Sequence, residues 1–155
     1  MSRTIDSHQD SPDQDIADLE SVISPELYRR PTRPPDYASE NRGLVALAEA
    51  MTASPEDIMK KLADTALDLC RAHSAGLSLL YGDRNQFRWA AIAGQWSTHL
   101  GGGTPREFGP CGTVLDRNAP LLFARPERHF KYLASVKPLI EEGLLIPIHA
   151  GGQAI

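Results

Sequence analysis

The chain has 155 residues, a length typical of one domain, of which 41% are hydrophobic and 23% charged. Its formal net charge of −4 argues against a nucleic-acid-binding surface, which needs clustered lysine and arginine. No apolar run approaches the roughly 18 residues that span a bilayer, and the N-terminus lacks the basic start and apolar core of a signal peptide. Two cysteines, Cys70 and Cys111, are too few for a disulfide framework or a four-ligand zinc site, which indicates a reducing cytoplasm. We therefore expect a cytoplasmic protein without nucleic-acid, membrane or metal partners.

The first 38 residues are expected to form a disordered acidic leader and a proline-rich linker. Six acidic residues and one basic residue fall in the first 20 positions, and large apolar side chains are few. Such a segment buries too little surface to offset its chain entropy. The stretch RRPTRPPDY (29–37) contains three prolines, which prevent helix formation and favour an extended linker. The folded unit is therefore predicted to cover residues 39–155.

Two helices are predicted at the start of this unit, over residues 39–53 and 54–73. In the first, the residues expected to face the core at helical spacing are Leu44, Leu47, Ala48 and Met51. Gly43 weakens this helix by about 1 kcal/mol relative to alanine. In the second, Ser54 is a plausible N-cap and Pro55 fits the first helical position. The core stripe predicted for this helix is Met59, Leu62, Ala66 and Leu69, with Ile58, Ala63 and Cys70 beside it.

The hydrophobic period then changes to two, which predicts strands at 75–81 and 86–94 joined as an antiparallel hairpin. The second strand is expected to present Phe87, Trp89, Ala91 and Ala93 on one face. Residues 95–109 are glycine-rich and predicted to form a long loop, a kind of segment that is often functional. The elements expected beyond it are a short helix at 112–118, a strand at 119–126, a short helix and connection at 128–143, a strand at 144–150, a Gly-Gly turn at 151–152 and the beginning of another strand at 153–155.

Four segments carry a resemblance to a known family: LDLCRAHSAGLSLLY (67–81), FRWAAIAG (87–94), PCGTVLDRNAPLLF (110–123) and EEGLLIPI (141–148). Together with the order of elements, they resemble a GAF domain, the small-molecule-sensing module of bacterial signalling proteins. The resemblance spans about residues 33–155, and the segments are similar to the GAF input domains that precede bacterial sensor histidine kinases.

This resemblance implies an α+β, PAS-related fold with one central antiparallel sheet. Helices from both ends of the domain would pack on one face of the sheet, and a ligand pocket would lie on the other. Family members continue beyond the final GGQAI with the rest of a strand and a long helix. We therefore expect this unit to lack its C-terminal strand and helix.

The candidate pocket residues are Trp89, Trp96, Arg106, Cys111 and Phe123, and the identity of the ligand or of any cofactor stays unknown. Cys111 has two interpretations. Near a helix N-terminus a thiol becomes more acidic and reactive, yet a small side chain also fits a turn between Pro110 and Gly112. Bilin-binding relatives typically attach the chromophore through a cysteine that histidine follows, whereas Gly112 follows here. Reductase relatives use more than one cysteine around the pocket.

Three further side chains also have two interpretations. Arg106 could hold an anionic ligand group as a bidentate donor or bond loop carbonyls. Trp89 could line the pocket or pack under the helices. His99 is a lone loop histidine, a type of residue that is more often solvated than ligating.

The function expected from these observations is that of a non-catalytic sensory domain. The small molecule it would bind is unknown, and the protein partners considered are a second copy of the chain and a histidine kinase or response regulator. One alternative is a thiol-based redox sensor or reductase acting through Cys111. Another is a dimerisation module that uses the 39–52 helix and binds no ligand.

Overall fold

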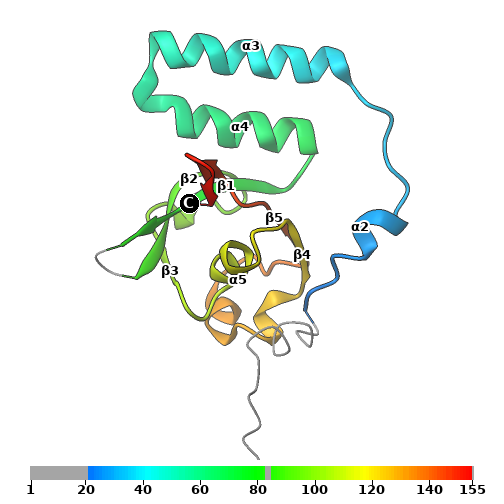
Figure 1. The fold of residues 1–155 in the computed structure, drawn as a ribbon, viewed down its shortest axis with the longest axis vertical. Coiled ribbons are helices and arrows are strands. Elements are labelled where there is room, and N and C mark those ends of the chain that lie inside the picture. The colour runs from blue at the N-terminus through cyan, green and yellow to red at the C-terminus, as the bar shows by residue number, and fades with distance from the viewer. Residues whose placement is uncertain (1–20, 83–84, 155) are drawn as a thin grey trace, which may run out of the picture.

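The computed structural model of the chain describes residues 21–82 and 85–154, which form an α+β fold (Figure 1). In chain order, its helices and strands are α2 (Glu26–Arg29), α3 (Tyr37–Ala53), α4 (Ile58–Cys70), β1 (Ser74–Tyr81), β2 (Gln86–Gly94), β3 (Gly103–Pro105), α5 (Pro110–Arg117), β4 (Leu121–Ala124), β5 (Glu142–Leu145), β6 (His149–Ala150) and β7 (Gln153–Ala154), with 3-10 helices η1 (Pro55–Asp57), η2 (Ser97–His99), η3 (Pro126–Arg128) and η4 (Lys131–Ser135).

These elements are stacked in layers. Helix α3 is outermost, α4 lies between it and the β1–β2 hairpin, and α5 with β4 and β5 lies beyond the hairpin (Figure 1). Two clusters of buried side chains hold the layers together. One joins α4 to the hairpin through Ala63, Ala91 and Ala93. The other gathers Phe123, Phe130 and their neighbours below the hairpin.

The strands form three antiparallel groups among the described residues, β1–β2–β3, β4–β5 and β6–β7, instead of one continuous sheet. The strand expected over 144–150 is interrupted: β5 ends at Leu145 and β6 begins at His149. Pro147 lies between them and has no amide hydrogen to donate to a neighbouring strand. The predicted Gly-Gly turn is confirmed: Gly151 and Gly152 both have positive φ, of 59° and 82°, and close the β6–β7 hairpin. The long loop expected over 95–109 contains η2 and β3.

A β-bulge in the hairpin decides which side chains of β2 face the helices. Leu77 pairs with Ala91, but the next residue, Ser78, pairs with Trp89, so that Ala90 is an extra residue. Paired residues share a face, and successive pairs alternate between faces. Ala91 therefore packs toward α4, whereas Trp89 points to the opposite side. The prediction that Trp89 shares a face with Ala91 is wrong for this reason.

Helix α3 crosses α4 at Gly43. A methyl group at this position would lie 2.9 Å from Thr65 Cγ2 and 3.3 Å from Leu69 Cδ1, so the missing side chain permits the close approach. With this side of α3 turned to α4, Leu44 and Met51 are each 65% exposed. The prediction that these two residues face the core is wrong.

The side of α4 that faces the sheet also differs from the predicted apolar stripe. Ala63 is 1% exposed and packs on the alanines of β2, because small side chains let the helix approach the sheet closely. Met59 and Leu62 are displaced to the edge of the contact and are 40% and 37% exposed. Cys70 is exposed, so its predicted place in the core is wrong.

Residues 21–30 differ from the disordered leader expected there. Val22 forms an antiparallel bridge with Phe123 of β4 and packs on the cluster around it. On either side of this bridge, Ile23 N donates to Leu122 O at 2.8 Å and Ala124 N donates to Ser21 O at 2.7 Å. The leader expected over residues 1–20 lies outside the described residues, and a domain boundary at residue 38 stays a prediction.

The backbone pairing of residues 21–23 is expected to contribute to stability. Ile23→Pro removes the donor to Leu122 O and leaves this carbonyl without its partner, which should lower the free energy of unfolding by about 1–2 kcal/mol. Urea denaturation measures the change. Thr32→Pro, in the exposed stretch between α2 and α3, is the matched control and should stay within about 0.5 kcal/mol of the wild type. Equal midpoints for Ile23→Pro and the wild type would contradict the docking of this segment.

Candidate functional site

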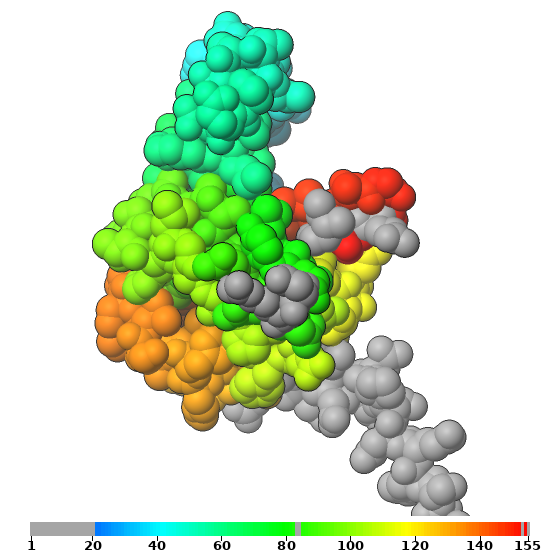
Figure 2. All heavy atoms as spheres, turned by 90° about the vertical axis from the view of Figure 1, so that its left-hand side faces the viewer, coloured from blue at the N-terminus to red at the C-terminus, as the bar shows by residue number. Residues whose placement is uncertain are grey.

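A cavity of about 310 Å³ lies below the hairpin, on the face of β2 opposite to α4. Figure 2 shows the yellow-green loop after β2 directly above the orange segment that contains η4, and the cavity lies where these two segments meet. The residues that line it are Trp89, Thr98, His99, Leu100, Gly102, Gly103, Thr104, Tyr132, Leu133 and Val136. A volume of this order lies at the lower end of the range for small-molecule sites.

An aromatic cluster of Trp89, Trp96 and His99 lies beside the cavity, and two of its members, Trp89 and His99, form part of the wall. The two indole rings are centred 5.1 Å apart with an interplanar angle of 43°. The His99 ring lies edge-on to both, at 6.1 Å from Trp89 and 5.4 Å from Trp96. These are the separations at which aromatic pairs attract one another. His99 is therefore half-buried and packs against both indole rings.

The aromatic cluster also joins the loop to the segment after η4. Trp96 Nε1 donates to Pro138 O at 2.8 Å, and His99 Nε2 lies 2.8 Å from Lys137 O. A carbonyl oxygen only accepts, so Nε2 of His99 carries a proton. The two hydrogen bonds hold together the opposing sides of the cavity.

A hydroxyl cluster of Ser78, Thr104 and Tyr132 lies around Cys111, and two of its members, Thr104 and Tyr132, line the cavity. All three hydroxyl oxygens are buried, and Tyr132 Oη has no hydrogen-bond partner within the described residues. The pKa of the Cys111 thiol is raised by burial, an effect that hydrogen bonding from the hydroxyls of Ser78 and Thr104 partly offsets. The pKa of Tyr132 is raised as well, mainly by burial and further by the neighbouring Cys111. Both groups therefore stay protonated at neutral pH.

The Pro-Cys-Gly sequence is explained by its backbone. Pro110 occupies the first turn of α5, where its missing amide hydrogen costs nothing. A methyl group at Gly112 would lie 1.9 Å from Arg106 O, so only glycine lets α5 start this close to the preceding loop. Cys111 lies between the two on the inner side. Because burial opposes ionisation of its thiol, the geometry favours the structural interpretation over an activated thiol.

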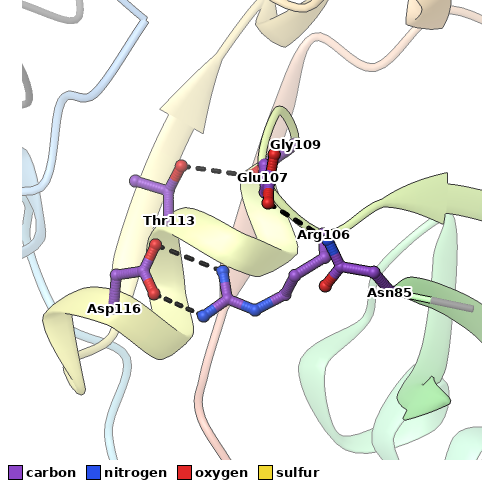
Figure 3. A network of polar contacts seen from close by, with 6 residues as sticks. All are labelled: Asn85, Arg106, Glu107, Gly109, Thr113 and Asp116. Carbon is purple, nitrogen blue, oxygen red and sulfur yellow. Dashed lines mark hydrogen bonds and ion pairs between the residues drawn. The ribbon is translucent and has the colours of Figure 1, made fainter. Parts of the chain in front are cut away.

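Arg106 is already paired. Its Nη1 and Nη2 donate to Asp116 Oδ2 at 3.2 Å and Oδ1 at 2.5 Å, which joins the loop to α5 (Figure 3). The hydrogen bond to Asp116 raises the pKa of Arg106. Figure 3 also shows Asn85 Nδ2 donating to Glu107 at 3.3 Å beside this pair. The bidentate capacity of this guanidinium is therefore used within the protein and not held free for an anion.

The structure brings only part of the predicted site together. Trp89 lines the cavity, and Trp96 and Cys111 adjoin residues that line it. Phe123 is completely buried in the core, and neither it nor Arg106 is among the residues that line this cavity. That any of the five binds a ligand stays a prediction.

Thr104 and Tyr132 line the cavity but were not predicted to do so. Thr104 follows three glycines and Tyr132 lies in the connection expected over 128–143, and neither context has a sequence pattern that indicates a binding site.

Among residues 21–82 and 85–154, no group of three or more histidine, cysteine or acidic side chains is placed to hold a metal ion. Within the same residues, no helix has the length and apolar character required to cross a membrane.

The arrangement of helices around antiparallel strands defines an α+β domain, and comparison with solved structures specifies its fold. The GAF domain of a phosphoenolpyruvate-protein phosphotransferase from Acinetobacter superposes with a TM-score of 0.64 at 16% identity, over 80% of this chain and 75% of that one. The corresponding domain from Coxiella burnetii gives 0.61 at 20% identity, over 77% and 75%. A phycoerythrobilin-bound GAF domain from a cyanobacterial phytochrome gives 0.58 at 11% identity, over 79% and 78%.

The chain has the GAF fold, as its sequence resemblance predicted. At these identities the likeness establishes the fold alone. No protein-family model and no curated protein matched the sequence.

The two cysteines are expected to differ in reactivity toward a disulfide reagent. Cys70 is exposed, whereas burial raises the pKa of Cys111, so one thiol per chain should react rapidly near neutral pH. Cys70→Ser should abolish this fast phase, and the matched variant Cys111→Ser should retain it. Stopped-flow absorbance measures both rates, and unfolding in guanidinium chloride should make both thiols accessible. A fast phase that depends on Cys111 would revive the redox alternative.

Proposed function

We propose that this chain is a non-catalytic GAF sensory domain that binds a small molecule in the cavity below β2. The observation that carries the proposal is the cavity of about 310 Å³ itself, whose wall combines the aromatic rings of Trp89 and His99 with the apolar side chains of Leu100, Leu133 and Val136. Small-molecule sites are typically clefts of this order of volume, lined mainly by apolar and aromatic side chains.

The signal would be a shift between two arrangements of the cavity walls. The ligand must bind one arrangement more tightly than the other, since equal binding shifts no equilibrium. Strand β2 offers a route for this coupling, because Trp89 lines the cavity and Ala91 packs on α4 across the sheet. Displacement of Trp89 would alter the packing of α4 and α3. A histidine kinase or response regulator is the recipient that the sequence resemblance suggests.

Native mass spectrometry of the full chain tests this proposal. After incubation with the small-molecule fraction of a bacterial extract, the wild type should retain a discrete adduct. Trp89→Ala should lose it, because this side chain forms part of the cavity wall. Phe108→Ala is the matched control: it removes a 52% exposed aromatic side chain outside the cavity lining and should retain the adduct. Absence of any adduct that depends on Trp89 would count against ligand binding.

A second proposal concerns self-association through α3. Three apolar side chains on the outer side of this helix are strongly exposed: Leu44 at 65%, Val45 at 57% and Met51 at 65%. Figures 1 and 2 both show α3 standing clear of the sheet, so a second copy could reach this side without obstruction. Exposed apolar side chains gathered on one helix often mark an interface.

Sedimentation velocity distinguishes monomer from dimer. The wild type should sediment as a dimer, and the double variant Leu44→Glu, Met51→Glu should sediment as a monomer, because it places charges in the apolar contact. Tyr28→Glu introduces the same charge at a 91% exposed position on α2 and should remain dimeric. A wild type that is monomeric at every concentration would exclude this second proposal.

A further inference from the structure

The described part of the chain begins beside a basic surface that follows β4. This basic surface consists of Arg125, Arg128 and Lys131, all of which are exposed. None of the three has an ion-pair partner among the described residues. We infer that residues 13–20 of the same chain, the acidic segment, dock on this basic surface through their carboxylates.

The turns after β4 keep the three cations close together in space. Arg128 N donates to Arg125 O at 3.0 Å, and Phe130 N donates to Pro126 O at 2.8 Å, immediately before Lys131. These hydrogen bonds fold the backbone tightly, so that the three side chains leave a short stretch of chain. The positive charge of the surface is therefore concentrated.

The acidic side chains near this surface leave most of its charge unopposed. Glu127 is the one acidic residue among positions 125–137, and its Oε2 is buried. Glu142, at the start of β5, is already held by Arg30 through two hydrogen bonds of 2.7 and 2.8 Å. Glu141 accepts a backbone hydrogen bond from Arg125 N but forms no ion pair with it. A segment with several carboxylates would supply the missing counter-charges.

The pairing of residues 21–23 with β4 directs the acidic segment to this surface. Ala124 N donates to Ser21 O at 2.7 Å, and Arg125 is the next residue along the chain. Figure 1 shows the blue start of the described chain beside the gold segment that follows β4. Because the pairing is antiparallel, the backbone direction at Ser21 points the preceding residues toward η3 and not away from it.

The acidic segment also matches the basic surface in charge and in reach. Its carboxylates belong to Asp13, Asp15, Asp18 and Glu20, and its sequence DQDIADLE contains no basic residue. An extended chain covers about 3.3 Å per residue, so all four acids can lie within about 26 Å of Ser21. An exposed ion pair is individually weak, but the tether at Ser21 gives the segment an effective concentration on the order of millimolar. Several weak pairs then suffice for docking.

The docked segment would lie next to the cavity wall. Lys131 is the first residue of η4, and Tyr132 and Leu133, which follow it, line the cavity. Ion pairs with Lys131 would therefore restrain the segment that carries this wall. Such docking does not require a ligand in the cavity.

Cross-linking of the full chain with a carbodiimide tests the docking, because this reagent joins a carboxylate to a lysine amine only at direct contact. Peptides that join Lys131 to residues 13–20 should be about tenfold more abundant than peptides that join Lys61 to the same residues. Lys61 is an exposed lysine on α4 and reports random encounters. Raising the salt concentration from about 0.1 M to about 1 M shortens the Debye length from about 10 Å to about 3 Å and should lower this ratio severalfold. Equal abundance at low salt would overturn the docking.

A charge reversal tests the role of the basic surface. Arg128→Glu should lower the yield of the Lys131 cross-link about fivefold, because it replaces an attraction by a repulsion. Arg117→Glu is the matched control: it makes the same change at an exposed arginine in the last turn of α5 and should leave the yield unchanged. Both variants should keep the circular dichroism of the wild type, since both positions are exposed. Equal yields in the two variants would overturn the assignment of the surface.

A mixture of unlabelled and heavy-isotope-labelled chains separates docking within one chain from docking between two copies. Each cross-linked peptide pair should carry a single label. Pairs that combine both labels would overturn the intramolecular contact and place the acidic segment on a second copy. Because none of these results depends on an adduct in native mass spectrometry, the docking and the proposed function succeed or fail separately.

Discussion

The extra residue at Ala90 is the constraint on which the rest of the structure depends. It reverses the alternation of β2, so that one strand serves two layers: Ala91 and Ala93 pack on α4, and Trp89 points to the cavity. Without the bulge, Trp89 would point toward α4, where the contact is built from alanines and has no room for an indole. The bulge therefore allows alanines to face α4 and the large indole ring to face the cavity within the same strand. Bulges near functional sites commonly redirect a side chain in this way.

The loop after β2 is positioned by contacts at both of its ends. At one end the aromatic cluster bonds the carbonyls of Lys137 and Pro138. At the other, the Arg106 pair and the close approach of Gly112 fix the beginning of α5 (Figure 3). Thr104 lies between these two attachments, paired through β3 with Phe87. A segment without much secondary structure is therefore held in a defined place, as a binding wall requires.

Much of the fold could be predicted from sequence, and the errors have identifiable causes. Hydrophobic periodicity located both long helices and the β1–β2 hairpin, and the Gly-Gly pair located the turn at 151–152. It failed for the outward side of α3 because Leu44 and Met51 are apolar yet exposed, and periodicity cannot tell a partner surface from a core. It failed for Trp89 because a bulge has no sequence pattern. It failed for residues 21–23 because their pairing uses backbone groups. It failed for the cavity because the residues that line it come from separate elements, β2, η2, β3 and η4 among them.

The stacked indoles have a further consequence. The chain contains two tryptophans, and both belong to the aromatic cluster, 5.1 Å apart. All of the indole absorption and emission of the molecule therefore originates in this cluster, in which Trp89 lines the cavity and Trp96 lies next to Trp89. Rings this close share their excited states, so their near-ultraviolet circular dichroism depends on the angle between them. Opening of the loop would change that angle, and a molecule beside Trp89 would change the polarity that it senses. The protein thus carries an intrinsic optical reporter without background signal from other tryptophans. Circular dichroism would follow movement of the loop, and fluorescence would follow occupation of the cavity.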